Sequence, residues 1–285
     1  VTSPPYYGLR NYGGEDNQIG QEDTPEQFID NLVSVFRSVR DVLTDDGTLW
    51  VNIGDSYYNY RPGKGQALVK QSVSKTKQDL PDKCARRGNK LEGLKEKDMI
   101  GIPWMLAFAL RADGWYLRQD IIWHKPNPMP ESVRDRCTKS HEYLFLLSKN
   151  KKYYYDNEAI KEPVKQDWGT RNRDAGKYHN PGTGLQPHSG LTKSYERKNK
   201  RDVWTITNKP YKGAHFAVFP PDLIEPCILA GSERGDIILD PFMGSGTTGM
   251  VAKKHGRNYI GCELHEDYAS LQTDRIDSIP SQLVL

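Results

Sequence analysis

The sequence predicts an α/β protein with an open, mostly parallel sheet, and three observations carry that prediction. The apolar run at 237–239 is typical of a short buried strand, because turn signals bound it on both sides. A turn with Gly244 and Gly246 follows, and the pattern of 248–254 is then that of a helix. A second apolar strand comes next, at 258–262. A strand, a glycine turn and a helix in this order predict a ligand site at the carboxyl edge of the sheet.

The glycine turn excludes some classes of ligand. Gly244 and Gly246 have a G-x-G spacing without the third glycine of dinucleotide sites, and no Gly-Lys-Thr follows. Pyrophosphate and triphosphate ligands are therefore not expected. Asp240 stands just ahead of the glycines, where it would repel a phosphate and favour a cationic or hydroxyl-rich ligand. Glu263 follows the second strand, a position that suits the two hydroxyls of a ribose.

The chain opens on a rigid turn, Ser3-Pro4-Pro5-Tyr6, directly after a predicted strand end. Two consecutive prolines can continue neither a sheet ladder nor a helix. The turn presents the Ser3 hydroxyl, exposed carbonyls such as that of Pro4, and the flat ring of Tyr6. Hydroxyl and carbonyl oxygens can accept the hydrogens of an exocyclic amine while an aromatic ring stacks on the base. The turn therefore predicts a holder for the amino group of a nucleobase.

Two motifs carry a resemblance to a known family. The run Asp240-Pro241-Phe242-Met243-Gly244-Ser245-Gly246-Thr247-Thr248 resembles the S-adenosylmethionine loop of amino-group DNA methyltransferases. Ser3-Pro4-Pro5-Tyr6 resembles the catalytic S/D/N-P-P-Y motif of the β class, in which the catalytic motif precedes the cofactor loop. The resemblance covers most of the chain. It implies a Rossmann-like S-adenosylmethionine methyltransferase fold, with a seven-stranded, mostly parallel sheet, one antiparallel edge strand and a circularly permuted motif order.

The same resemblance implies a function and a cofactor site. The Ser form of the catalytic motif favours transfer of a methyl group from S-adenosylmethionine to the N4 amine of a cytosine flipped out of duplex DNA. Two alternatives stay open: transfer to adenine N6 by the same site, and a catalytically weak DNA-binding protein of the same fold. The segment 212–220 resembles the family's motif ahead of the cofactor loop, which adds His215, Phe216 and Phe219 to the expected cofactor contacts. A homodimer and a cognate restriction endonuclease are both compatible with this interpretation.

Periodicity and capping signals place the other elements. Helices are predicted at 25–43, 99–112 and 221–230, with strands at 48–53, 115–123, 141–148 and 203–206. Thr24 and Asp98 are the expected caps of the first two helices, and Asp55 could line the target pocket or be a structural turn residue. The resemblance implies that 141–148 forms the antiparallel edge hairpin with 153–156.

Charge is unevenly spread along the chain. Residues 57–97 hold 11 Lys and Arg against 4 Asp and Glu, and residues 149–201 hold 13 against 6, although the net charge of the whole chain is only +3. Two basic segments on an acidic body predict a surface that faces a polyanion. We expect one methyltransferase domain over 1–285, with a basic insertion loop at 57–97 and a target-recognition insertion at 157–201. The expected DNA contacts are Lys125, Asn127, Arg171, Arg173, Lys177 and Arg197.

Several classes of protein are excluded. The four cysteines show no C-x-x-C pair and no histidine at ligand spacing, so neither a metal site nor a disulfide framework is expected. No run approaches the ~18 apolar residues of a membrane span, and no signal peptide opens the chain, so we expect an intracellular protein without a membrane partner.

Pro226-Cys227 mimics a cytosine-C5 methyltransferase nucleophile, but its helical pattern predicts a core cysteine. Relatives carry further residues before the catalytic turn, so the strand feeding this turn is expected to be absent or to precede Val1 in a longer protein.

Overall fold

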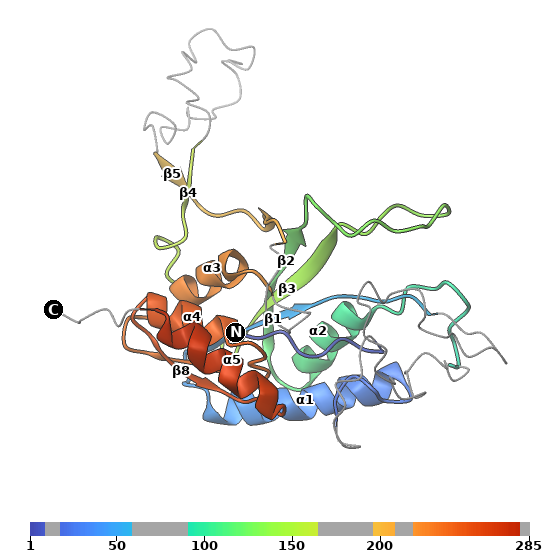
Figure 1. Ribbon diagram of the computed structural model, residues 1–285, viewed down its shortest axis with the longest axis horizontal. Helices are drawn as coiled ribbons and strands as arrows, with labels where there is room; N and C mark the ends of the chain where they lie inside the picture. The colour runs from blue at the N-terminus through green and yellow to red at the C-terminus, as the bar shows by residue number, and fades with distance from the viewer. Residues whose placement is uncertain (9–17, 59–90, 165–195, 209–218, 280–285) are drawn as a thin grey trace, which may run out of the picture.

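The computed structural model describes residues 1–8, 18–58, 91–164, 196–208 and 219–279. A four-stranded sheet with the order β1-β3-β2-β6 forms its centre (Figure 1). The strands are β1 (Thr48–Ile53), β2 (Tyr116–His124), β3 (His141–Ser148) and β6 (Val203–Thr205). β6 runs parallel to β2, whereas β3 runs antiparallel to both of its neighbours. The positions of these strands agree with the sequence prediction to within one residue at each end.

The antiparallel strand lies inside the sheet, which corrects the prediction of an antiparallel edge strand. β3 pairs along its length with β1 on one side and with β2 on the other. Its side chains from Leu144 onward are buried on both faces of the sheet, as a central strand requires. The expected partner segment 153–156 forms no strand, because its backbone bonds elsewhere: Tyr154 N–H donates to Asp46 O (2.8 Å) and Asp156 N–H to Ala230 O (2.8 Å).

The amino-terminal residues join the central sheet to a second pair of parallel strands, β7 (Ile237–Asp240) and β8 (Asn258–Gly261). Thr2 forms a parallel bridge with Val51 of β1, in which Thr2 N–H donates to Trp50 O (2.9 Å) and Asn52 N–H to Thr2 O (2.9 Å). On the other side, the Val1 nitrogen donates to Leu239 O of β7 (3.1 Å). The Ser3–Tyr6 turn and the glycine turn therefore leave from adjacent positions in the sheet.

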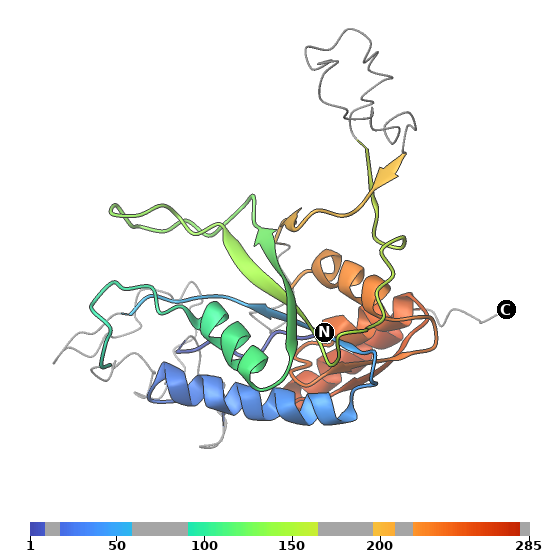
Figure 2. The ribbon, with the colours of Figure 1, turned by 180° about the vertical axis from the view of Figure 1, so that it is seen from behind.

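Helices cover both faces of the sheet (Figures 1 and 2). One core contains α1 (Pro25–Val42) and α2 (Ile102–Ala112), packed against Val51, Ile53 and Phe145. The other contains α3 (Pro221–Gly231) and α4 (Thr247–Lys254), packed against Trp50, Trp123, Leu144 and Leu146. The last helix, α5 (Glu266–Asp277), packs on α4. Successive side chains of a strand point to opposite faces of the sheet, so neighbouring residues of one strand contribute to different cores.

The two predicted helix caps had different outcomes. Thr24 caps α1, accepting the Gln27 N–H at 3.2 Å, with Pro25 at the first helical position, as predicted. α2 begins three residues later than predicted, at Ile102, and Asp98 does not cap it. Instead the Asp55 carboxylate accepts the Gly101 N–H (3.0 Å) and the Ile102 N–H (3.1 Å). Asp55 is therefore a structural residue here, since it satisfies orphan donors at a helix amino terminus.

Most of the two basic insertions lies outside the described residues, but their ends are described. β4 (Glu162–Pro163) and β5 (Arg197–Lys198) form a two-residue antiparallel ladder, which stands apart from the sheet in Figures 1 and 2. The two ends of the second insertion are therefore side by side. At the first insertion, Tyr57 forms an isolated bridge with Met99, and Tyr58 N–H donates to Asp98 O (2.8 Å). At each insertion, the residues that enter and leave it are therefore paired by backbone hydrogen bonds.

Candidate active site

The Ser3–Tyr6 turn, the predicted catalytic motif, lies beside the end of β1 and the start of β3. Because β3 is antiparallel, its first residues reach the edge at which β1 and β2 end. Ser3 Oγ donates to Asn52 Oδ1 of β1 at 3.4 Å. The hydroxyl hydrogen is thereby directed into the protein. The oxygen lone pairs of Ser3 remain as acceptors for an incoming amine.

The Asn52 side chain is buried, and its neighbours fix the orientation of its amide. Nδ2 donates to Tyr143 O (3.0 Å) and to Glu142 Oε2 (3.4 Å). Since both neighbours are acceptors, Nδ2 must face them and Oδ1 must face the catalytic turn. Oδ1 is then the acceptor within reach of both Ser3 and Tyr6. Asn52 belongs to the strand 48–53 that the sequence predicted, but no role of its side chain was predicted.

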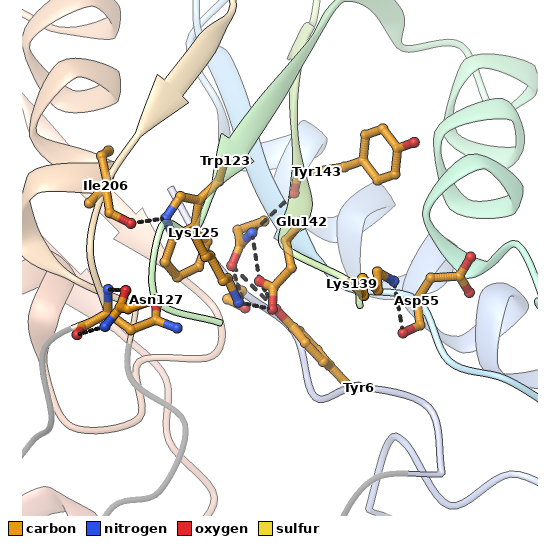
Figure 3. Close-up of polar contacts among 12 residues, drawn as sticks. Tyr6, Asp55, Trp123, Lys125, Asn127, Lys139, Glu142, Tyr143 and Ile206 are labelled. Atoms are coloured by element: carbon orange, nitrogen blue, oxygen red, sulfur yellow. Dashed lines mark hydrogen bonds and ion pairs between the residues drawn. The ribbon is translucent and has the colours of Figure 1, made fainter. Parts of the chain in front are cut away.

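Two contacts hold the Tyr6 ring in place. Its hydroxyl donates to Glu142 Oε2 at 2.7 Å (Figure 3). The ring lies so close to the backbone of Gly54 that a Cβ added there would be 2.7 Å from Tyr6 Cε2. Real Cβ atoms do not approach a ring so closely, and only glycine fits beside Tyr6 in this position. The ring orientation is therefore set by one hydrogen bond and one steric contact.

We expect Gly54→Ala to lower the rate of methyl transfer by roughly 10- to 100-fold, because displacing a positioning group by even 1 Å is costly. The affinity for S-adenosylmethionine should not change, because Gly54 contacts the catalytic turn and not the glycine turn. Steady-state rates on duplex DNA, with cofactor binding measured by calorimetry, check this. In a Tyr6→Ala background the same change should have no further effect, and full activity of the single variant would contradict the placement of Tyr6.

Glu142 is the charged residue at the centre of this cluster, and the sequence analysis missed it. Its carboxylate accepts from Tyr6 and Asn52 and forms an ion pair with Lys125, and both charged side chains are only 16% exposed. The Lys125 ammonium also lies 4.1 Å from the centre of the Trp123 ring (Figure 3). The sequence could have indicated this role. The strand at 141–148 is apolar apart from its ends, and a glutamate at the start of a buried strand is expected to pair with a hydrogen-bond donor or a cation.

The predicted cofactor loop begins with Asp240, which is 1% exposed. Asp240 Oδ1 accepts from Thr2 Oγ1 (2.5 Å) and from Phe242 N–H (3.0 Å), and Oδ2 accepts from Thr248 Oγ1 (2.5 Å). Burial raises the pKa of this carboxyl, and the three donors oppose that rise. Asp240 thus fastens Thr2, just ahead of the Ser3–Tyr6 turn, to both ends of the glycine turn. The sequence predicted a cofactor contact, whereas the geometry favours a role in positioning the loop.

Glu263 lies beside the glycine turn, just after the end of β8. Its Oε2 accepts the Gly244 N–H (2.8 Å) and its Oε1 accepts the His265 N–H (2.9 Å). Each carboxylate oxygen has a further lone pair, so two acceptors remain for a diol. Helix α5 holds the other side of the turn, where Gln272 Nε2 donates to Gly244 O (2.8 Å) and Arg275 Nη1 to Ser245 Oγ (2.8 Å).

The other predicted cofactor residues lie in the glycine turn, at the start of α4, beside the core, or outside the described residues. Gly246 has a left-handed backbone (φ 81°) and caps α4, whose first residues Thr247 and Thr248 are buried. Pro241 and Phe242 follow Asp240 in the turn, and the Phe242 ring packs on Phe36 of α1 with centroids 6.4 Å apart. Phe219 packs on the core that contains α3. His215 and Phe216 lie outside the described residues.

The residues expected to contact DNA are only partly described. Lys125 lies in the ion pair with Glu142, and Asn127 uses both ends of its amide on the backbone of Asn208, at 3.1 Å each. Arg197 Nη2 donates to Lys161 O (2.8 Å) in the stem of the second insertion. Arg171, Arg173 and Lys177 lie outside the described residues. Contact of any of these residues with DNA stays a prediction.

The described residues also test the expectations about Cys227, metal sites and membrane helices. Cys227 is fully buried within α3, so the prediction of a core cysteine is confirmed, and burial raises the pKa of its thiol. Across the described ranges, three or more His, Cys, Asp or Glu side chains are nowhere grouped to hold a metal ion. None of the helices in the described parts has the length and apolar character needed to cross a membrane.

Comparisons with known proteins show the family of the chain. A family model described as a DNA methylase of the N6/N4 type matches residues 1–274. The chain is 47% identical over 284 residues to the type II methyltransferase M.Cfr9I of Citrobacter freundii, covering 100% of this chain and 82% of that protein. It is 50% identical over 281 residues to M.SmaI of Serratia marcescens, covering 97% and 82%.

Solved structures are similar to the chain at the level of the fold. The PvuII DNA methyltransferase (cytosine-N4-specific) gives a TM-score of 0.60 at 18% identity, over 96% of this chain and 77% of that one. A Thermus thermophilus protein complexed with S-adenosyl-L-methionine gives 0.58 at 22% identity, over 99% and 86%. The residues at the glycine turn fit that cofactor, because the Glu263 carboxylate beside the turn keeps two acceptors for a diol.

The fold and the site together define an α/β methyltransferase that uses S-adenosylmethionine. The chain belongs to the N6/N4 DNA methylase family. It is a DNA methyltransferase of the kind found in restriction-modification systems.

Proposed function

We propose that the chain methylates the N4 amine of a cytosine flipped out of duplex DNA, and that Ser3, Pro4, Pro5 and Tyr6 form its catalytic turn. The observation that carries this proposal is the contact between Ser3 Oγ and Asn52 Oδ1. Because the Ser3 hydrogen points to Asn52, its lone pairs can accept a hydrogen of the target amine. The Pro4 carbonyl supplies a second acceptor. Two acceptors on one amine draw its nitrogen toward tetrahedral geometry and expose its lone pair.

Tyr6 supplies the surface on which the extruded base stacks. Its ring is already oriented by Glu142 and Gly54, so little ordering remains when the base arrives. Stacking offsets part of the few kcal/mol that extrusion from the duplex costs. S-adenosylmethionine supplies the activated methyl group. The chain's own residues orient the amine and hold acceptors toward the charge that develops on it, which are the two effects expected to provide most of the rate.

The cofactor half of the site is built from the glycine turn and the end of β8. Glu263 is proposed to accept the ribose hydroxyls, and Asp240 to hold the turn against the catalytic strand. The backbone of 241–248 and, from the resemblance, His215, Phe216 and Phe219 complete the cofactor site. In this arrangement the catalytic motif comes first in the chain and the cofactor motif last, which is the circularly permuted order of the β class.

The basic insertions are proposed as the DNA-reading parts of a single domain. Segment 157–201, with Arg171, Arg173, Lys177 and Arg197, recognises the target sequence, and 57–97 assists it, since Lys neutralises phosphate and Arg reads base edges. The relatives M.Cfr9I and M.SmaI are type II methyltransferases by name. We propose by analogy that a cognate restriction endonuclease accompanies this chain, and a homodimer stays a prediction that sedimentation can test.

The test is direct identification of the methylated base. The protein is incubated with mixed-sequence duplex DNA and labelled S-adenosylmethionine, the DNA is digested to nucleosides, and these are separated by mass. N4-methylcytosine is the expected product. N6-methyladenine would contradict the proposed base while leaving the site unchanged, and DNA binding with no labelled nucleoside would favour the alternative of a binding protein.

A further inference from the structure

We infer that Glu142, paired with Lys125, is a positioning residue that fixes Tyr6 and Asn52 for the target base. Neither residue of this pair belongs to the catalytic motif itself. The inference rests on the proposed role of the turn Ser3–Tyr6. It adds the Glu142 carboxylate, at the start of β3, as the acceptor that fixes the geometry of that turn.

The strand register brings the pair together. Glu142 of β3 lies directly opposite Trp123 of β2 in the antiparallel ladder. Lys125 follows two residues after Trp123, so its side chain leaves on the same face, and its ammonium reaches both the Trp123 ring and the Glu142 carboxylate. On the other side of β3, Leu144 is paired with Asn52. Asn52, Glu142 and Trp123 therefore share one face of the sheet.

The two oxygens of Glu142 have different partners. Oε1 accepts from Lys125, whereas Oε2 accepts from Tyr6 Oη (2.7 Å) and Asn52 Nδ2 (3.4 Å). The cation thus holds one end of the carboxylate, and the two groups of the proposed catalytic site bind the other end. Figure 3 shows Glu142 between Lys125 and Tyr6. A charged acceptor in a largely enclosed site makes stronger and better oriented hydrogen bonds than a neutral one.

Loss of the Glu142 carboxylate should affect both Tyr6 and, through Asn52, Ser3. If Oε2 is removed, Tyr6 loses its tether and its ring can turn away from Gly54. Asn52 loses one of the two acceptors that fix its amide, and a rotated amide would present Nδ2 to Ser3. The Ser3 hydrogen would then no longer be directed into the protein. Glu142 touches neither the base nor the amine in this scheme, so it acts through Tyr6 and Asn52.

The experiment is a double-mutant cycle on transfer to duplex DNA. Glu142→Gln and Tyr6→Phe should each lower kcat/KM for DNA by roughly 10-fold, the effect of losing one hydrogen bond to a charged group. The double variant should lose clearly less than the product of the two single losses, because both changes break the contact between Glu142 and Tyr6 and only the contact with Asn52 remains for Glu142→Gln to weaken. KM for S-adenosylmethionine should stay unchanged in all three. A double loss of about 100-fold, the product of the single effects, would show independent action and overturn the inference.

Lys125 provides the rescue test. Lys125→Met should lower kcat/KM for DNA much as Glu142→Gln does, whereas Lys125→Arg keeps the cation and should retain most of the activity. Glu131→Gln is the matched control, because it breaks the ion pair with Arg136 in the same β2–β3 connection and should leave rates unchanged. Equal losses in Lys125→Arg and Lys125→Met, with unchanged melting temperatures, would contradict the role of the pair.

Two further outcomes separate this inference from the proposed function. If Ser3→Ala has no activity while Glu142→Gln has full activity, the catalytic turn stands and the role of Glu142 falls. If Glu142→Gln abolishes transfer even in the Tyr6→Phe background, Glu142 takes part directly in the reaction and is not a positioning residue. Full activity of Ser3→Ala would remove the proposed site itself.

Discussion

Ser3→Ala is expected to lower the single-turnover rate of methyl transfer by about 100- to 1,000-fold, the typical cost of removing one preorganised hydrogen-bonding group at developing charge. In the proposed site, the Ser3 oxygen is the side-chain acceptor that the turn offers to the target amine. Its hydrogen is directed to Asn52 Oδ1, so the loss of the hydroxyl also leaves that amide oxygen without one of its donors. The Pro4 carbonyl remains, and the residual rate should reflect it.

Cofactor affinity distinguishes this loss from a folding defect. The Ser3 side chain bonds to β1 and not to the glycine turn, so Ser3→Ala should bind S-adenosylmethionine as tightly as the parent protein. Ser56→Ala is a suitable control, because Ser56 Oγ donates only weakly to Tyr7 O (3.5 Å) near the same strand end. Its rate should be unchanged. If Ser3→Ala transfers methyl groups at the parent rate, the amine is held by other residues and the assignment of the turn is wrong.

Asp240→Ala is expected to lower the free energy of unfolding by about 3 kcal/mol, since a buried donor left without its acceptor costs about 1–3 kcal/mol. Three donors lose their acceptor at once: the hydroxyls of Thr2 and Thr248 and the Phe242 N–H. The sum is reduced because burial of the carboxylate is itself unfavourable, as the raised pKa of Asp240 indicates. Affinity for S-adenosylmethionine should fall too, because the glycine turn loses its tie to the catalytic strand.

Urea unfolding gives the measurement, with the midpoint reporting stability and the slope reporting the surface exposed. Asp240→Asn should be milder than Asp240→Ala, because Oδ1 survives and Thr248 Oγ1 has a second acceptor in Val1 O (3.5 Å). Asp236→Ala is the control just before the same strand: this aspartate is exposed and caps a turn at Glu233 N–H (2.8 Å). If Asp240→Ala and Asp236→Ala destabilise the protein equally, Asp240 does not fasten the two halves together.

Local sequence was sufficient wherever an element is defined by its own periodicity or by special backbone residues. The helix after Thr24, the strand at 48–53 and the strand before Asp240 lie where they were predicted. The start of α2 was wrong because its cap is Asp55, 46 residues earlier than Gly101 in the chain. A capping search that looks only at adjacent residues cannot find such a partner.

The sequence alone predicted which two turns would carry the chemistry, Ser3–Tyr6 and Asp240–Thr248, because prolines and glycines restrict the backbone locally and can be recognised one residue at a time. Only the tertiary structure decided what surrounds them. Tyr6 and Glu142 are separated by 136 residues, and Thr2 and Asp240 by 238. The central position of β3 brings Glu142 to the site, and strand pairing of this kind depends on contacts between distant segments that no local pattern encodes.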